Sequence, residues 1–382
     1  MNFILYENIL LYNNNFYYDK DKIYTTSLND RIYKPFTPLD IKTINIMEAP
    51  VYFNTPVLLL DSFHWNPAHC VWNFIYPSWY GLFNKLTDKS EFDNFQWIIF
   101  DNLSDFHVYT NKNMIETISG NPIENINSFI NKFNKPIIIK YLVTGLEGIG
   151  IGHVNKHNLT VSRGLEINNI DPVEKFVDRI YYKYNIIRNS LVNNLDICNN
   201  IIFIKNKRNL NGIDELFNKL NIKYNKQYNF KIIDYSEYSF DEQLGILNTT
   251  CVCITGVGSA RFNTPFLPNG AIEIQTFQPN PHRKNFIEYV DYHGGTLSKN
   301  HKVMNIPYYT QEEANNKKCS HLLEEYIDTA VKNIPCKFPI NLEDNIPKEI
   351  LGLRYHKNYD TLFDKWRDSM SNRIDEFIDM LN

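Results

Sequence analysis

One stretch decides the fold of this chain: Asn248-Thr-Thr-Cys-Val-Cys-Ile-Thr-Gly-Val-Gly-Ser-Ala-Arg-Phe-Asn-Thr-Pro-Phe-Leu-Pro-Asn-Gly-Ala-Ile-Glu-Ile-Gln275. It contains two short apolar runs, Cys251–Thr255 and Ala271–Gln275. Short apolar runs bounded by Gly and Pro are typical of strands buried in a parallel sheet. We expect the two strands to be joined by a short helix that starts at Ser259 and is stopped by Pro268-Asn269-Gly270.

A tight glycine turn, Gly256-Val257-Gly258, connects the first of these strands to the helix. Glycine lets a phosphate approach the backbone, where free N–H groups and the helix dipole stabilise its charge. Ligands of open α/β sheets bind at the carboxyl ends of the strands, which is where this turn lies. The pattern predicts a nucleotide or nucleotide-sugar site, although a structural turn without a ligand has the same sequence.

A dinucleotide site is a weaker interpretation of the same turn. The dinucleotide fingerprint needs a small residue three positions after the second glycine, where the helix packs closely on the strand. Arg261 occupies that position. Glu273 matches the acidic residue that binds ribose in such sites, so an NAD-dependent oxidoreductase stays open as an alternative.

The composition is that of an ordinary globular protein. Hydrophobic residues make up 43% of the 382 residues and charged residues 21%, enough for two or three domains with apolar cores. The net charge of −4 and the lack of a basic stripe argue against a nucleic-acid partner. No apolar run approaches the roughly 20 residues of a membrane helix, and the N-terminus does not resemble a signal peptide. We expect no integral membrane segment.

The cysteines indicate the compartment. The 6 cysteines are scattered without a Cys-x-x-Cys pair, which predicts neither a zinc site nor a disulfide framework. Asn248-Thr-Thr matches a glycosylation sequon, but a position directly before a buried strand is awkward for a glycan. We therefore expect a reducing, cytoplasmic compartment and no bound metal.

The first half of the chain predicts strands and helices without a regular alternation. Ile9–Tyr12 and Phe16–Tyr18 flank Asn13-Asn14-Asn15, as in a hairpin. Asn66 can cap a helix that carries His69 and Asn73 on one face. Further expected elements are strands at 57–60, 97–100 and 136–143, a helix at 123–133, and a long helix that opens with the capping box Asp171-Pro-Val-Glu174 and keeps helical spacing as far as Ile187.

The second half alternates strands with helices. The expected strands are Ile201–Ile204, Phe230–Asp234, Cys251–Thr255 and Ala271–Gln275, and the expected helices between them are Ile213–Leu220 and Ser239–Asn248. This alternation is typical of a parallel sheet. The tail predicts a helix at 311–332, a proline-marked linker and a final helix at 360–381.

Two stretches resemble glycosyltransferase family 61, and they occur in the order that the family has. The first, Asn66-Pro-Ala-His69 followed by Pro77, is similar to the family's Asn-x-x-His and later proline. The second is similar to the family's Gln, His-Gly-Ala-Gly-Leu-Thr-Asn, Phe-x-Pro-x-Gly and Glu, and it comprises Gln243, Thr255–Asn263, Phe266–Gly270 and Glu273. Between them, Lys205–Asn211 resembles the family's Arg-Arg-x-x-Asn segment.

The resemblance implies an α/β protein of GT-B type, with two Rossmann-like domains facing across a cleft. It also implies an inverting, metal-independent glycosyltransferase that needs no cofactor. The implied partners are a nucleotide-sugar donor and a glycan or other hydroxyl acceptor. We expect an acceptor-side domain at 1–195, a nucleotide-sugar-binding domain at 196–340, and a helical segment at 341–382 that returns to the first domain.

Transfer without a metal needs positive charge or N–H groups at the leaving diphosphate and a base for the acceptor's proton. The resemblance implies that His69 is the catalytic base. It implies that the substrate-binding residues are Asn66, Lys205, Arg208, Gly256, Gly258, Ser259, Ala260, Arg261, Asn263 and Glu273. A solvated basic loop would explain Lys205 and Arg208 equally, and a strand-end ion pair would explain Glu273.

Two positions depart from the family's pattern. Val257 stands where the family has histidine, and Asn73 where it often has an acid. A non-catalytic relative that binds carbohydrate or nucleotide therefore stays open as an alternative function. Asp61, His64 and His153 are rival candidates for the base.

Overall fold

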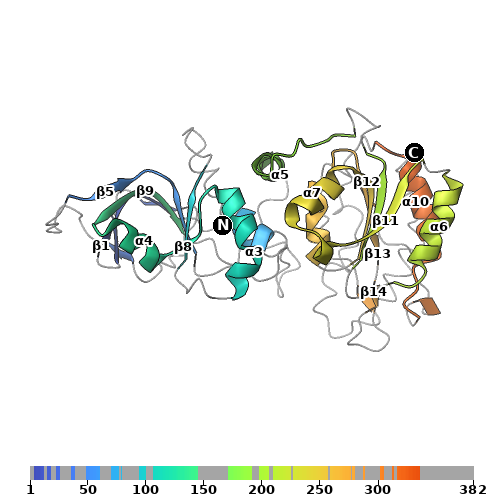
Figure 1. Ribbon diagram of the computed structural model, residues 1–382, viewed down its shortest axis with the longest axis horizontal. Coiled ribbons are helices and arrows are strands. Elements are labelled where there is room, and N and C mark those ends of the chain that lie inside the picture. Colours follow the sequence, from blue (N-terminus) through green and yellow to red (C-terminus); the bar gives the residue numbers. More distant parts are fainter. Residues whose placement is uncertain are drawn as a thin grey trace. The chain divides into compact units, whose positions relative to one another are not determined.

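The computed structural model describes residues 4–12, 15–18, 23–25, 36–38, 49–60, 70–76, 79, 94–99, 106–144, 171–191, 198–205, 210–224, 227–256, 259–276, 278–279, 287–288, 302–304, 312–313 and 316–335. These residues divide into two compact units. Unit 1 takes the described residues up to Tyr184, and unit 2 takes those from Asn185 on. Both units combine strands with helices (Figure 1), so the expected α/β class is confirmed.

Unit 1 is built on a mixed sheet in the order β4-β2-β1-β9-β6-β7-β8, with β3 paired to β1 and β5 paired to β9. Strand β1 runs antiparallel to β2, β3 and β9, whereas β9, β6, β7 and β8 pair in parallel. The parallel part is compatible with a Rossmann-like fold. The strands are β1 (Ile4–Tyr12), β2 (Asn15–Tyr18), β3 (Ile23–Thr25), β4 (Phe36–Pro38), β5 (Val51–Phe53), β6 (Val57–Leu60), β7 (Gln96–Ile99), β8 (Glu124–Asn125) and β9 (Ile137–Thr144).

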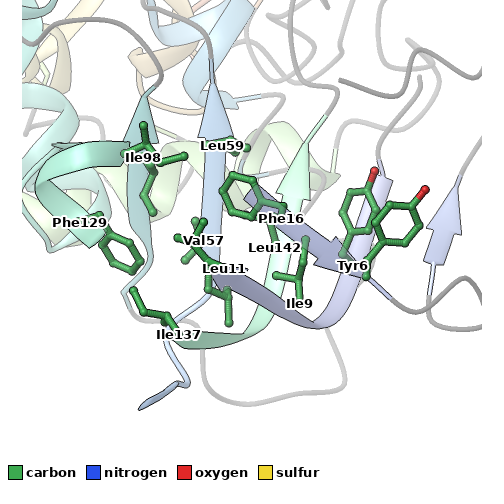
Figure 2. Packing of buried hydrophobic residues seen from close by; sticks show 13 residues of the cluster. Tyr6, Ile9, Leu11, Phe16, Val57, Leu59, Ile98, Phe129, Ile137 and Leu142 are labelled. Carbon is green, nitrogen blue, oxygen red and sulfur yellow. The ribbon is translucent and has the colours of Figure 1, made fainter. Parts of the chain in front are cut away.

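The core of unit 1 lies between this sheet and helix α4 (Ile126–Phe133). Figure 2 shows Phe129 of α4 facing apolar side chains from several strands, among them Ile98 and Ile137. The Phe129 ring is fully buried and meets the ring of Phe53 edge-on at 5.0 Å. Burial of aliphatic and aromatic area of this kind is the main stabilising term of a sheet face.

Several predictions for unit 1 are confirmed and others are corrected. The hairpin is present, with Leu10 opposite Tyr17. Helix α4 starts at Ile126, because the side chain of Asn125 accepts a hydrogen bond from Ser128 N at 2.6 Å and caps it there. The helix expected around His69 and Asn73 is corrected in its type: its described part, Cys70–Ile75, is a π-helix, η3.

Two further helices belong to unit 1. Helix α3 (Phe106–Ser119) was not predicted, because its first turn carries no acidic residue and polar residues interrupt its apolar positions. Helix α5 (Asp171–Lys183) begins where predicted but ends before Ile187. Asn185 follows it with a φ of 55°, which breaks the helix, and Ile187 is 88% exposed. The apolar spacing that continues from α5 to Ile187 therefore does not correspond to a helix.

Unit 2 contains a parallel sheet in the order β11-β10-β12-β13-β16. Its main strands are β10 (Asn200–Lys205), β11 (Asn229–Asp234), β12 (Thr250–Gly256), β13 (Ile272–Thr276) and β16 (Lys302–Met304), and β14 (Gln278–Pro279) pairs with β15 (Ile287–Glu288) apart from them. Its helices are α6 (Ile213–Lys223), η5 (Tyr235–Glu237), α7 (Phe240–Asn248), η6 (Ser259–Phe266) and α10 (Leu323–Lys332). The predicted alternation and the parallel pairing are confirmed.

The helices of unit 2 cover both faces of this sheet (Figure 1). Helices α6 and α10 lie on one face, where Tyr224 Oη donates to Asp328 Oδ1 at 2.6 Å. Helices α7 and η6 pack together on the other, with the rings of Phe240 and Phe266 5.8 Å apart. The arrangement is that of a doubly wound sheet.

The described part of the decisive stretch, which leaves out Val257 and Gly258, folds as predicted with one difference in helix type. Helix η6 begins at Ser259 as expected, but it is a 3₁₀-helix that contains Pro265. Gly270 ends the following turn with a φ of 91°, a conformation that side chains disfavour.

In the tail, the helix predicted at 311–332 is shorter: α10 starts at Leu323, and Lys317 before it has a φ of 51°. The linker after Pro335 and the final helix at 360–381 lie outside the described residues. Among the described helices, none has the length and apolar content needed to cross a membrane.

Asn248 anchors the segment by which the chain enters unit 2. Its Nδ2 donates to Ile187 O at 2.8 Å, and its Oδ1 accepts from Asn189 N at 2.7 Å. The Asn189 side chain returns a hydrogen bond to Asn248 O at 2.8 Å. Asn248 is 6% exposed and both ends of its amide are engaged, so the sequon is not open to a glycan in the folded chain.

We expect Asn248→Ala to lower the stability of unit 2 by roughly 2–4 kcal/mol, because Ile187 O and Asn189 N both lose a buried partner. Native-state hydrogen exchange of the β12 amides measures this change within unit 2. Asn218→Ala on an exposed position of α6 is the matched control and should change stability by less than about 0.5 kcal/mol. Equal exchange in the two variants would contradict the anchoring role.

Candidate functional site

The strand order of unit 2 creates a switch point between β10 and β12. The chain passes from β10 to β11 on one side and then crosses to β12 on the other. Connections therefore leave these two strands in opposite directions, and the carboxyl ends of strands at such a point are where doubly wound sheets bind ligands. The residues at those ends are Lys205 on β10 and Gly256 on β12. Two of the predicted substrate-binding residues are thus placed at the switch point.

The β10 side of this edge carries a charged pair. Lys205 is exposed and lies opposite Asp234, the last residue of β11. The carboxylate of Asp234 accepts hydrogen bonds from Ser236 Oγ at 2.6 Å and Ser236 N at 3.0 Å. These hydrogen bonds, with a smaller contribution from the charge of Lys205, lower the pKa of Asp234. Lys205 thus keeps a negative neighbour at neutral pH.

Asn211 fixes the far end of the segment that starts at Lys205. Its backbone N donates to Lys317 O at 2.6 Å, and its backbone O accepts from Cys319 N at 2.9 Å. Its side chain adds a hydrogen bond to Asn316 O at 2.9 Å. Arg208, the other predicted cation of this segment, lies outside the described residues.

The β12 side consists of the glycine turn and helix η6. Gly256 is a buried residue of β12, while Val257 and Gly258 lie outside the described residues. The structure gives the backbone of Ser259, Ala260 and Arg261 in η6, and their side chains are outside what it describes. Asn263 is the first residue of η6 with a described side chain, and its Nδ2 donates to Gln243 Oε1 at 3.0 Å.

Thr255, the residue before Gly256, forms a buried polar pair with Glu273 of β13. Thr255 Oγ1 donates to Glu273 Oε1 at 2.9 Å, and both residues are 0% exposed. Thr276 Oγ1 donates to Thr255 O at 3.3 Å, so the ends of β12 and β13 are linked by side chains as well as by the ladder. Burial raises the pKa of the neighbouring Cys253 thiol, and the charge of Glu273 raises it further. These contacts hold the strand end from which the turn leaves.

The predicted base and its rivals lie outside the described residues. The base is His69 and its rivals are Asp61, His64 and His153; the predicted substrate-binding residue Asn66 also lies outside them. The following helix η3 is described in part: Cys70, Val71 and Ile75 are buried in unit 1, and only the backbone of Asn73 is given. Unit 1 therefore fixes the chain directly after His69.

Sequence reasoning missed the partners that hold these residues. Asn211 was placed in a basic motif, but its partner segment lies 105 residues further along the chain and carries no signal of contact. Thr255 was assigned to a strand and to the motif stretch, but its hydrogen bond to Glu273, 18 residues further along the chain, was not predicted. Asp234 showed a usable signal, since an Asp followed two residues later by Ser is typical of a helix cap.

One comparison with known proteins supports the family that the motifs resemble. The family model described as Glycosyltransferase 61 matches residues 103–274, from just before α3 to β13. The match includes Lys205, Gln243 and Gly256, and the segment around His69 precedes it. The comparison with curated proteins found no match. The match over residues 103–274 therefore supports glycosyltransferase family 61, as the resemblance predicted.

Proposed function

We propose that this protein transfers a sugar from a nucleotide-sugar donor to a hydroxyl of a glycan or similar acceptor, with inversion and without a metal ion. The observation that carries the proposal is the position of Lys205 and Gly256. Both lie within the family match and at the carboxyl ends of the two strands that flank the switch point. Ligands of doubly wound sheets bind at such a point.

On the donor side, the diphosphate would lie over the turn Gly256–Ala260. The free N–H groups at the start of η6 and its dipole favour negative charge there. Lys205 and Arg208 would approach the phosphates from the β10 side and Arg261 from η6. When the bond between the sugar and the diphosphate breaks, the leaving group gains charge, and these groups stabilise it more than they stabilise the ground state.

Glu273 would contribute mainly through Thr255. Its carboxyl group is fully buried and accepts the Thr255 hydroxyl, so contact with a ribose would require it to become exposed. A buried carboxylate with a hydrogen-bond donor resists displacement, because breaking the pair leaves an uncompensated polar group. We therefore propose that Glu273 keeps the end of β12 in place beneath the donor, with ribose contact as the second possibility.

On the acceptor side, His69 would be the base, with Asn66 nearby on the same segment. The acceptor hydroxyl attacks the anomeric carbon, the bond from that carbon to the diphosphate oxygen breaks, and the hydroxyl proton passes to the imidazole. A single displacement inverts the configuration. Neutral imidazole suits this role because its pKa lies near physiological pH.

The GT-B arrangement is also a proposal. We propose an acceptor-side domain at 1–195, a donor domain at 196–340, a helical segment at 341–382 that returns to the first domain, and a cytoplasmic location. The parallel sheet of unit 2 and the parallel part of the sheet of unit 1 support the two Rossmann-like halves.

A non-catalytic relative is the second candidate. Its support is Asn73 at a position where the family often has an acid, and Val257 where it has histidine. The amide of Asn73 takes up no proton near neutral pH, so it cannot replace a base. Such a relative would bind the nucleotide-sugar and transfer nothing. The oxidoreductase interpretation is weaker, because Arg261 occupies the position where a dinucleotide turn needs a small residue.

The proposal is tested by offering a panel of nucleotide-sugars and measuring thermal stabilisation and slow donor hydrolysis. We expect one nucleotide class to stabilise the protein and Gly258→Leu to abolish that stabilisation, because the side chain fills the phosphate position. Gly245→Ala in α7 is the control, since a Cβ there meets no atom within 4 Å. If no nucleotide-sugar binds the unaltered protein, the proposal is wrong, and binding without turnover favours the non-catalytic relative.

Replacement of the base should separate chemistry from binding. We expect His69→Ala to lower kcat by about 10²-fold or more, the usual scale for loss of a general base, with donor affinity nearly unchanged. Steady-state kinetics with the donor found above measure both. An unchanged kcat would move the role to Asp61, His64 or His153, which the same substitution tests one at a time.

Metal independence has a direct measurement. We expect the transfer rate in excess EDTA to stay within about twofold of the untreated rate, because cationic side chains and N–H groups stabilise the leaving diphosphate. A rate abolished by EDTA and restored by manganese would replace this proposal with a metal-assisted transfer.

A further inference from the structure

The side chain of Gln243 connects three elements of unit 2. Its Nε2 donates to Tyr235 O and to Tyr238 O, each at 3.0 Å, and its Oε1 accepts from Asn263 Nδ2 at 3.0 Å. Gln243 itself lies on α7, the two carbonyls belong to the loop after β11, and Asn263 lies on η6. Both ends of the amide are therefore engaged with protein partners.

These elements all meet at the carboxyl edge of the sheet. The loop that Gln243 holds follows β11 directly, and Asp234 caps its short helix η5. Asp234 in turn lies opposite Lys205. Helix η6 follows the glycine turn after β12. The Gln243 amide thus joins the β11 and β10 side of the switch point to the β12 side.

Further contacts hold the two helices that the hydrogen bond between Gln243 and Asn263 connects. Ser239 N and Ser239 Oγ donate hydrogen bonds to Glu242 Oε2 at 2.8 Å and 2.7 Å, and these fix the start of α7. The C-terminal half of η6 is held by apolar packing, since Phe266 and Leu267 are at most 1% exposed. Asn263 precedes these buried residues in the chain and is closer to the glycine turn. Its bond to Gln243 is therefore well placed to set where η6 begins.

We infer that Gln243 and Asn263 are positioning residues for donor binding: their hydrogen bond fixes the start of η6 relative to the loop after β11. This inference rests on the proposed function. Backbone N–H groups bind a phosphate only when they point at it, and an error of about 1 Å at such a site costs much of the binding and rate. Asn263 acts in this way through Gln243 and need not touch the donor.

Asn263→Asp breaks the connection with almost no change in shape. The introduced carboxylate cannot donate to Gln243 Oε1. If the Gln243 amide rotates to donate to that carboxylate, its oxygen faces the carbonyls of Tyr235 and Tyr238, so one side of the connection is lost in either orientation. Asn263→Ala is the second variant and removes the donor without adding a charge.

The matched control is Asn200→Asp at the opposite edge of the same sheet. Asn200 Nδ2 donates to Thr249 Oγ1 at 2.7 Å, at the amino end of β10. Asn200→Asp also removes one amide donor from a polar contact in unit 2. It should lower the melting temperature by a similar amount without reaching the donor site.

The measurements are the donor KM, kcat, and the rise in melting temperature caused by ADP, GDP, UDP or CDP. We expect both Asn263 variants to raise the donor KM roughly tenfold and to reduce the stabilisation by the nucleoside diphosphate, with kcat within about twofold. Asn200→Asp should leave KM and nucleotide stabilisation unchanged. The double variant Gln243→Met with Asn263→Ala should be no worse than Gln243→Met alone, because the two residues act through one bond.

The outcomes separate the inference from the function on which it rests. If no nucleoside diphosphate stabilises the unaltered protein, both are wrong. If the unaltered protein responds and the Asn263 variants respond equally, only the positioning role is wrong. Additive effects of Gln243→Met and Asn263→Ala would also overturn it, since they would indicate that Asn263 contacts the donor directly.

Discussion

The parallel register between β10 and β12 is the constraint on which the rest of the candidate site depends. Phe203 lies opposite Ile254, so the two strands reach their carboxyl ends together, at Lys205 and Gly256. Because β11 pairs with the other side of β10, the helices that follow the two strands cover opposite faces. A cation and a glycine turn from distant parts of the chain are thereby brought to one edge.

The loops at this edge are held by side chains. A loop has no ladder of its own, and its backbone groups need other partners when they are buried. Gln243 satisfies the carbonyls of Tyr235 and Tyr238, and Asn211 satisfies a carbonyl in the segment before α10. Amides suit this role because one side chain carries donors and an acceptor. Side chains thus give the connections at this edge a fixed geometry.

The sequence predicts unit 2 better than unit 1 for a physical reason. Strands of a doubly wound sheet are buried on both faces, so β10 and β12 appear as short apolar runs between amphipathic helices. Helix α3 gives no such signal, and helical spacing continues past α5 to Ile187, which a backbone turn at Asn185 exposes. The candidate residues were found from order and motif, whereas their partners were not. The contact between Asn211 and Asn316 depends on the tertiary fold, which no local pattern encodes.

The motif residues therefore fall into two groups: those whose polar groups have hydrogen-bond partners within the protein, and those whose polar groups face solvent. The polar groups of Gln243, Asn211 and Asn263 have partners within the protein, and the Glu273 carboxylate accepts the Thr255 hydroxyl. Lys205 extends into solvent at the strand end. A site that stabilises a departing diphosphate without a metal gains most when its dipoles are already oriented, because no free energy is then lost in reorganising them during the reaction. Polar residues that hold the backbone contribute to that state as directly as the cations that would touch the phosphates.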